Sequence, residues 1–237
     1  GLDGLSGSLA LIALLGFGIA NALWGVLGDQ YLIAVFSACV AGFLIFNLRT
    51  FWRSKAWVFL GDAGSMLLGL TLTWLAIRLS QGELRVMSPA AALWFLMLPI
   101  YDAVSMMLRR VLLRRSPFEA DREHLHHIFL LAGFSVGETV TLISGIAVGG
   151  VMVGLASILL AIPDVWVAAA FLGGGLLYYW AVIMRAWRLM RFLSRSICRR
   201  AGEDRREQHR HAQRRLNASG AYLGVDRRSG EDRRIAS

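Results

Sequence analysis

The sequence predicts an all-α fold, a polytopic membrane helix bundle of about six transmembrane helices with cytoplasmic loops. Hydrophobic residues make up 56% of the 237-residue chain and charged residues only 17%, whereas soluble domains average about 25% charged residues. Six apolar stretches each approach the roughly 20 residues that a helix needs to cross a bilayer. Strands are not expected, because ten-residue segments of alternating hydrophobicity are absent.

The six expected spans follow one another along the chain. In order, they cover residues 9–27, 31–47, 60–79, 89–108, 139–162 and 166–184. Ser88 and Pro89 predict an N-cap followed by a first-turn proline in the fourth span, and Ser135 with Glu138 predicts a capping box before the fifth. Overlapping small-xxx-small patterns in the fifth span favour close helix packing, at Gly145, Gly149, Gly150 and Gly154.

The distribution of basic residues predicts the orientation, because cytoplasmic loops are enriched in Lys and Arg. With a cytoplasmic chain start, only Arg78 and Arg85 of the 25 basic residues lie outside, and six spans return both chain ends to the cytoplasm. The inner side then holds every basic residue from 185 onward together with Arg49, Arg53, Lys55, Arg109, Arg110, Arg114, Arg115 and Arg122. The pI near 10.7 reflects this topology and a basic tail near anionic lipid, so no nucleic-acid partner is expected.

The composition divides the chain into a membrane domain, residues 1–195, and a basic cytoplasmic tail, residues 196–237, which is expected to be disordered. Cys39 falls within the membrane and Cys198 in the tail, so no disulfide is expected. The chain starts with Gly1 rather than Met and has no signal peptide before its first span. We therefore expect it to be a piece of a longer protein.

An acidic signature, Gly61-Asp62-Ala63-Gly64-Ser65, marks the cytoplasmic start of the third span. The unpaired N–H groups and the positive end of the helix favour an anion there. A carboxylate at this position suits a hard cation such as Mg²⁺, which takes a few protein oxygens together with substrate phosphates. The alternative is that Asp62 only caps its helix, since Asp is a favoured cap.

A histidine-rich turn, His124-Leu125-His126-His127, lies in the long cytoplasmic connection at residues 109–138. Together with Arg122, its imidazoles are suited to a diphosphate or to sugar hydroxyls. Two alternatives are a zinc site using the i, i+3 pair and an exposed polar turn. Asp102, an acid within an apolar span, indicates either a functional group or a buried hydrogen bond to a neighbouring helix. Asn47, at the end of the second span, is assigned no role.

Three segments together resemble successive motifs of the polyprenyl-phosphate N-acetylhexosamine 1-phosphate transferases. They are residues 1–7 (Gly-Leu-Asp-Gly-Leu-Ser-Gly), residues 59–65 (Phe-Leu-Gly-Asp-Ala-Gly-Ser) and residues 116–127 (Ser-Pro-Phe-Glu-Ala-Asp-Arg-Glu-His-Leu-His-His). The Asp-Arg-x-His-x-His-His form is more similar to the bacterial undecaprenyl-phosphate N-acetylglucosamine 1-phosphate transferases, in glycosyltransferase family 4, than to the muramoyl-pentapeptide enzymes. The likeness covers residues 1 to about 195.

The resemblance implies transfer of N-acetylglucosamine 1-phosphate from UDP-N-acetylglucosamine to undecaprenyl phosphate, with release of UMP, to start lipid-linked glycan synthesis for the cell envelope, such as O antigen. It also implies Mg²⁺, with Mn²⁺ as the alternative ion. The implied location is the bacterial inner membrane, with the active site on the cytoplasmic side. By similarity, Asp3 and Asp62 are catalytic, with Asp62 the metal ligand. The implied substrate-binding residues are Asp3, Phe59, Arg122, His124, His126 and His127.

Two departures from the family pattern concern acidic residues. The family carries an Asp-Asp pair on an earlier cytoplasmic loop, and this chain has no two adjacent aspartates. The first aspartate of the Asp-Gly-x-Asp-Gly motif would precede Gly1. Both absences fit loss of the N-terminal spans, so the chain alone is expected to be inactive and its full-length parent active.

Two other function classes stay open at this stage. One is an ion or proton transporter that uses Asp102 and the histidines, although the spans hold almost no other ionisable residue. The other is a non-catalytic membrane scaffold whose basic tail recruits partners. The identity of the sugar, the glycan pathway and a possible homodimer are also left open.

Overall fold

The computed structural model describes residues 2–49, 55–83, 85–112, 114, 116, 125–131 and 133–181. The chain divides into two units, Gly1–Met190 and Arg191–Ser237, and all described residues belong to the first. The tail expected at 196–237, with Cys198, lies outside them. All regular structure in these ranges is helical, with no strand. The predicted all-α fold is therefore confirmed.

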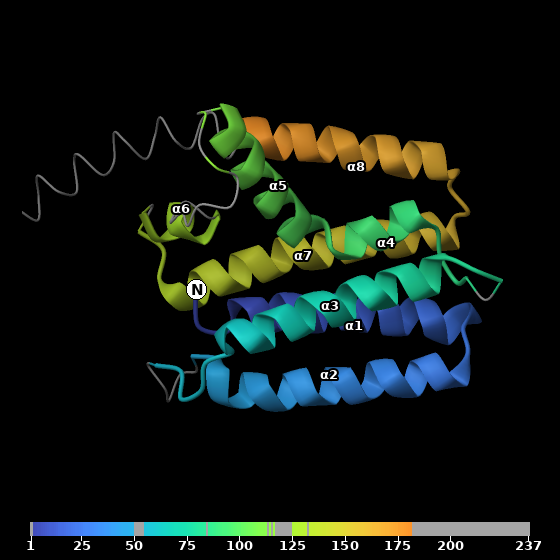
Figure 1. Cartoon of the computed structure of the whole chain (residues 1–237), viewed down its shortest axis with the longest axis horizontal. Coiled ribbons are helices and arrows are strands. Elements are labelled where there is room, and N and C mark those ends of the chain that lie inside the picture. Colours follow the sequence, from blue (N-terminus) through green and yellow to red (C-terminus); the bar gives the residue numbers. More distant parts are fainter. Residues whose placement is uncertain are drawn as a thin grey trace, which may run out of the picture. The chain divides into compact units, whose positions relative to one another are not determined.

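The described helices run in chain order through the unit (Figure 1). Their bounds are α1 (Leu5–Trp24), α2 (Leu27–Asn47), α3 (Gly61–Ser80), α4 (Pro89–Phe95), α5 (Met97–Leu112), α6 (Leu125–Leu131), α7 (Val136–Leu159) and α8 (Asp164–Tyr178). Within the described residues, α1, α2, α3 and α7 are long and apolar enough to cross a membrane, and α4 with α5 makes a fifth if the pair counts as one span. The described part of α8 has 15 residues, so the count of six remains a prediction.

Helix α1 lies at the centre of the packing and contacts α2, α3, α4 and α7. Its Leu14 and Phe17 are fully buried, as are Leu75 and Leu79 of α3. The ring of Phe17 meets Phe95 of α4 edge to face, with centroids 5.2 Å apart, a favoured aromatic geometry. This core joins α1 and α3, the helices next to the acidic motifs, to α4.

The fourth expected span, residues 89–108, is not one straight helix. It is divided into α4 and α5, which meet at an angle of 85°. The N–H of Leu96 bonds the carbonyl of Leu93 (3.1 Å), three residues back, and Pro99 has no N–H to give to the carbonyl of Phe95. Pro99 sits in the first turn of α5, where its missing donor costs least. The expectation of a continuous helix was wrong because it ignored this proline.

The predicted capping box of α7 is present: Ser135 Oγ accepts the N–H of Glu138, whose carboxylate accepts the N–H of Ser135. Two of the four glycines in the predicted small-xxx-small patterns lie against α4. A Cβ on Gly154 would approach a ring carbon of Phe95 to 2.5 Å, and one on Gly150 would approach the carbonyl oxygen of Trp94 to 2.9 Å. The predicted close packing is therefore confirmed for these two. A Cβ on Gly145 or Gly149 would meet nothing within 4 Å.

Arg78, one of the two basic residues expected outside, is paired with an acid. Its Nε lies 2.8 Å from Oδ1 of Asp29 in α2, and its guanidinium lies 5.9 Å from the ring centre of Trp74. The charge of Arg78 is thus neutralised by its neighbour at this end of the bundle. The pair also fastens the start of α2 to the end of α3.

Candidate active site

Two of the three predicted motifs, residues 1–7 and 59–65, meet at the end of the bundle where α1 begins, α2 ends and α3 begins (Figure 1). A polar pocket of about 220 Å³ opens there, and Asp3, Phe59 and Asp62 all line it. These three residues come from two motifs that are more than fifty positions apart in the chain. The fold thus brings together the acidic residues that the sequence picked out separately. We call this space the acidic pocket.

Asp62 occupies the first turn of α3 but does not cap it. The N-cap position is Leu60, and the Asp62 carboxylate forms no hydrogen bond or ion pair with any residue in the described ranges. Gly61 turns the chain into the helix with a φ of +67°, which favours glycine. The capping interpretation of Asp62 is therefore wrong. Its exposed carboxylate sits beside the positive end of α3.

Asp3 is held in place by basic and backbone donors. Its Oδ2 lies 2.8 Å from Nε of Arg49, just after α2, and accepts a long hydrogen bond (3.5 Å) from the N–H of Ala56. The Asp3 side chain is 13% exposed, so water screens this pair only in part. Asp3 therefore ties the start of α1 to the segment that leads into α3.

Asn47, to which the sequence assigned no role, connects the same two segments. Its side chain is buried, its Oδ1 accepts the N–H of Gly4 (2.8 Å), and its Nδ2 donates to the carbonyl of Val58 (2.6 Å). One amide thus fixes the backbone beside Asp3 and the backbone beside Phe59. A signal was present, since a polar amide ends an otherwise apolar helix, but its partners lie 43 and 11 residues away.

Phe59 lies at the rim of the acidic pocket and is 74% exposed. The segment before it packs on the end of α2: the N–H of Trp57 donates to the carbonyl of Phe46 (3.0 Å), and the two rings lie 6.5 Å apart. Phe59 therefore has a fixed backbone and a free ring face. An exposed aromatic ring of this kind can stack on a planar base.

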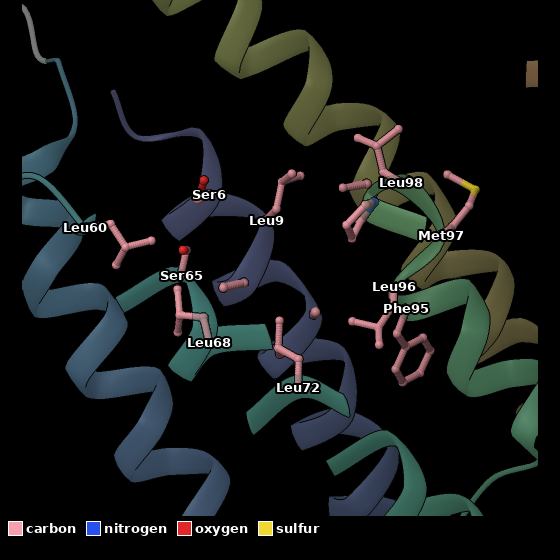
Figure 2. A pocket seen from close by; sticks show the side chains of 14 residues that line it. Ser6, Leu9, Leu60, Ser65, Leu68, Leu72, Phe95, Leu96, Met97 and Leu98 are labelled. Atoms are coloured by element: carbon pink, nitrogen blue, oxygen red, sulfur yellow. The ribbon is translucent and has the colours of Figure 1, made fainter. Parts of the chain in front are cut away.

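A second, apolar pocket of about 210 Å³ adjoins the acidic pocket and shares Ser6, Leu60 and Ser65 with it. Figure 2 shows these three residues on one side and the residues from Phe95 to Leu98, at the break between α4 and α5, on the other. The broken span thus forms one wall of the apolar pocket. Polar and apolar spaces side by side suit an amphipathic ligand with a charged head.

His126 and His127 lie on α6, which is found at the same end of the bundle as the acidic pocket (Figure 1). The rings of His126 and His127 are half-buried, with centroids 4.2 Å apart. Neither histidine lines the acidic pocket. Arg122 and His124 lie outside the described residues, so their predicted roles remain predictions.

Asp102 connects three helices. The residue lies on α5. Its Oδ1 accepts a hydrogen bond from the N–H of Leu125, the first residue of α6, and another from the hydroxyl of Tyr178 on α8, both at 3.2 Å. The predicted hydrogen bond from Asp102 to a neighbouring helix is therefore confirmed, although Asp102 is half-buried rather than buried.

The donor set in the acidic pocket suits Mg²⁺ better than zinc. No group of three or more His, Cys, Asp or Glu side chains in the described part of the chain could hold a metal ion, whereas structural and catalytic zinc sites use three or four protein ligands. Mg²⁺ needs only one or two carboxylates when substrate phosphates complete its shell. Asp62, whose carboxylate is unpaired within the described ranges, fits that requirement.

Part of the chain matches a known protein family. Residues 1–80, which contain Asp3, Phe59 and Asp62, match the model of glycosyl transferase family 4. No solved structure matches the chain significantly.

Curated relatives match most of the chain. It is 33% identical over 209 residues to the undecaprenyl-phosphate alpha-N-acetylglucosaminyl 1-phosphate transferase of Yersinia pestis, covering 87% of this chain and 57% of that protein. The proteins of the same name from Escherichia coli K12 (34% identical; 82% of this chain and 53% of the relative) and Haemophilus influenzae (32%; 80% and 53%) are also similar. The chain thus spans about half the length of these relatives. Its residues 1–80 belong to glycosyl transferase family 4, and its long apolar helices make it a membrane protein.

Proposed function

We propose that the full-length protein transfers N-acetylglucosamine 1-phosphate from UDP-N-acetylglucosamine to undecaprenyl phosphate. A phosphate oxygen of the lipid attacks the β-phosphorus of the nucleotide-sugar, and the bond from that phosphorus to the bridging oxygen breaks. UMP leaves with the bridging oxygen, and the sugar 1-phosphate stays on the lipid as a diphosphate. The names of the relatives support the lipid acceptor and the transferred group, undecaprenyl phosphate and N-acetylglucosaminyl 1-phosphate.

The acidic pocket is the single observation that carries the proposal. Asp3 and Asp62 line it at the positive end of α3, and Arg49 neutralises Asp3 at 2.8 Å. This leaves Asp62 as the acidic group that would hold Mg²⁺, or Mn²⁺ in its place. The ion, when bound, would neutralise charge on the diphosphate. Phe59 would stack on uracil at the rim, and His126 and His127 would approach the diphosphate from α6.

The adjoining apolar pocket supports a lipid acceptor. Its walls are almost entirely hydrophobic, and it meets the acidic pocket at Ser6 and Ser65. A prenyl phosphate could place its phosphate at this junction and its first apolar carbons beyond it. Such a site belongs at the membrane surface, since one substrate cannot leave the bilayer and the other cannot enter it. We place it on the cytoplasmic side of the bacterial inner membrane, where the basic residues gather.

The test measures UMP release by the purified full-length protein in detergent micelles. We expect UMP release with UDP-N-acetylglucosamine, undecaprenyl phosphate and Mg²⁺. The amount of UMP should equal the amount of N-acetylglucosamine that enters the lipid phase. Undecaprenol, which has the same chain without the phosphate, is the matched control acceptor and should give none. EDTA should abolish release, and added Mg²⁺ or Mn²⁺ should restore it.

The choice of sugar is read from the same assay with UDP-N-acetylgalactosamine and UDP-glucose as donors. Release with one of these and not with UDP-N-acetylglucosamine would correct the sugar and keep the reaction class. If no UDP-sugar gives UMP with the phosphorylated lipid, the proposal is wrong. No specific contact in the described residues favours the transporter or the scaffold as a second function.

A further inference from the structure

We propose that Asp102 is a positioning residue that sets the place of α6 and thereby of the His126–His127 pair. The expected effect of Asp102 on catalysis rests on the proposed function, whereas its expected effect on the position of α6 does not. The geometry joins three elements at one oxygen: Oδ1 of Asp102 on α5 accepts the N–H of Leu125 and the hydroxyl of Tyr178, each at 3.2 Å. Leu125 directly precedes the two histidines.

Helix α6 depends on such contacts because it has only seven residues. Isolated helices of this length do not form in water, since nucleation is costly. The first N–H groups of any helix also lack an intrahelical partner. Asp102 satisfies the first of them, that of Leu125, and so defines where α6 starts.

The side chain of Leu125 adds an apolar anchor to this polar one. It is 8% exposed and packs in a cluster with Leu98 of α5 and with Ile143 and Ala147 of α7. The backbone of Leu125 is therefore held by Asp102 while its side chain is held by the core. A rotation of α6 that moved the histidines would have to break both contacts.

Tyr178 fixes the direction of the Asp102 carboxylate from the opposite side. Its ring lies 5.7 Å from that of Tyr101 on α5, and Tyr101 in turn donates its own hydroxyl to the carbonyl of Phe171 on α8. The two tyrosines thus join α5 to α8. Only Tyr178 reaches Asp102, which makes Tyr101 a useful control.

Amide hydrogen exchange of the full-length protein in nanodiscs tests the inference without any substrate. With Asp102→Leu, the peptide that covers residues 125–131 should exchange about tenfold faster, because a helix-starting hydrogen bond is lost. Asp102→Asn keeps an oxygen acceptor and should stay within about threefold of the parent. Tyr101→Phe, which removes an α5–α8 hydrogen bond without touching α6, should leave this peptide unchanged.

A kinetic measurement then links α6 to the donor substrate. Asp102→Leu should raise the KM for the UDP-sugar about tenfold, leave the KM for undecaprenyl phosphate unchanged and reduce kcat by less. The Asn variant should restore the parent KM. If the full-length protein has no transferase activity, the proposed function fails and the exchange experiment still decides the role of Asp102.

Two results would overturn the inference. One is parent-like exchange of residues 125–131 in Asp102→Leu. The other is an equal rise in Tyr101→Phe, which would assign the effect to the α5–α8 contact as a whole. Should Asp102→Leu not accumulate in membranes, Tyr178→Phe decides instead. This variant removes one donor to Asp102, and exchange of the same peptide must rise about threefold over Tyr101→Phe.

Discussion

At the scale of single residues, the aspartates differ in what surrounds them rather than in their chemistry. Asp3 and Asp29 are each paired with an arginine at 2.8 Å, and Asp102 accepts hydrogen bonds from Leu125 and Tyr178. Asp62 has no such partner in the described ranges and opens into the acidic pocket. Of the two acids that line this pocket, Asp62 is therefore the one available to a cation.

Asp62→Asn should lower turnover roughly 100-fold or more, because loss of one charge-stabilising group at a reacting phosphate costs that much. Asp164 gives a matched control. It is also exposed in the first turn of a helix, α8, but at the opposite end of the bundle (Figure 1). Asp164→Asn should keep full turnover. The measurement is UMP release per protein, with membrane content followed by immunoblot; equal turnover in both variants would remove Asp62 from the metal site.

The candidate site could be predicted at this scale only where local chemistry marks a residue. Asp62 stands out as an acid next to two glycines at the start of an apolar stretch, and the structure adds that it is not a cap. Asn47 could not be assigned from sequence, because an amide at a helix end has many possible partners. Its two hydrogen bonds to Gly4 and Val58 exist only in the fold.

At the scale of elements, length and apolar composition predicted most of the helices, since a chain that crosses a bilayer must satisfy its backbone within each span. The break at Leu96 was missed, although Pro99 was visible. The angle of 85° depends on what α4 and α5 pack against, which no local signal contains. The break matters for function, because it forms one wall of the apolar pocket.

Helix α7 allows a test of packing within one element. Gly154→Ala places a methyl group 2.5 Å from the Phe95 ring and should destabilise the protein by about 1–3 kcal/mol, the usual cost of overpacking. Gly149→Ala, one helical turn and one residue earlier, meets nothing within 4 Å and should change stability by less than about 1 kcal/mol. Thermal unfolding in detergent measures both, and similar midpoints for the two variants would contradict the α4–α7 contact.

At the scale of the whole molecule, the arrangement of helix ends agrees with the charge distribution. The acidic pocket and α6 lie at one end of the described helices, as do Arg49 and Lys55, which follow α2 (Figure 1). Arg78 lies near the opposite end and is neutralised by Asp29. The positive-inside rule then predicts that the acidic pocket faces the cytoplasm.

Cysteine labelling tests this orientation. In the full-length protein with its native cysteines replaced, Gln81→Cys, just after α3, should react with a membrane-impermeant maleimide in cells whose outer membrane is permeable. Lys55→Cys, before α3, should react only after the inner membrane is opened. Both positions are exposed, so accessibility within the protein does not separate them. If both cysteines are labelled from the same side of the membrane, α3 does not span it. If only the cysteine at position 55 is labelled from outside, the acidic pocket faces outward and the predicted orientation is wrong.

Composition and spacing were enough to predict the fold class, the approximate spans, the bias of positive charge and the motifs around Asp3, Asp62 and the histidines. These are local properties, because each depends on the residues of one segment. Other features became visible only in the folded chain: Asp3 and Asp62 line one pocket, Asn47 links their segments, and Asp102 holds the start of α6. These contacts join positions between 11 and 76 residues apart, so they arise from the packing of helices and not from any pattern along one of them.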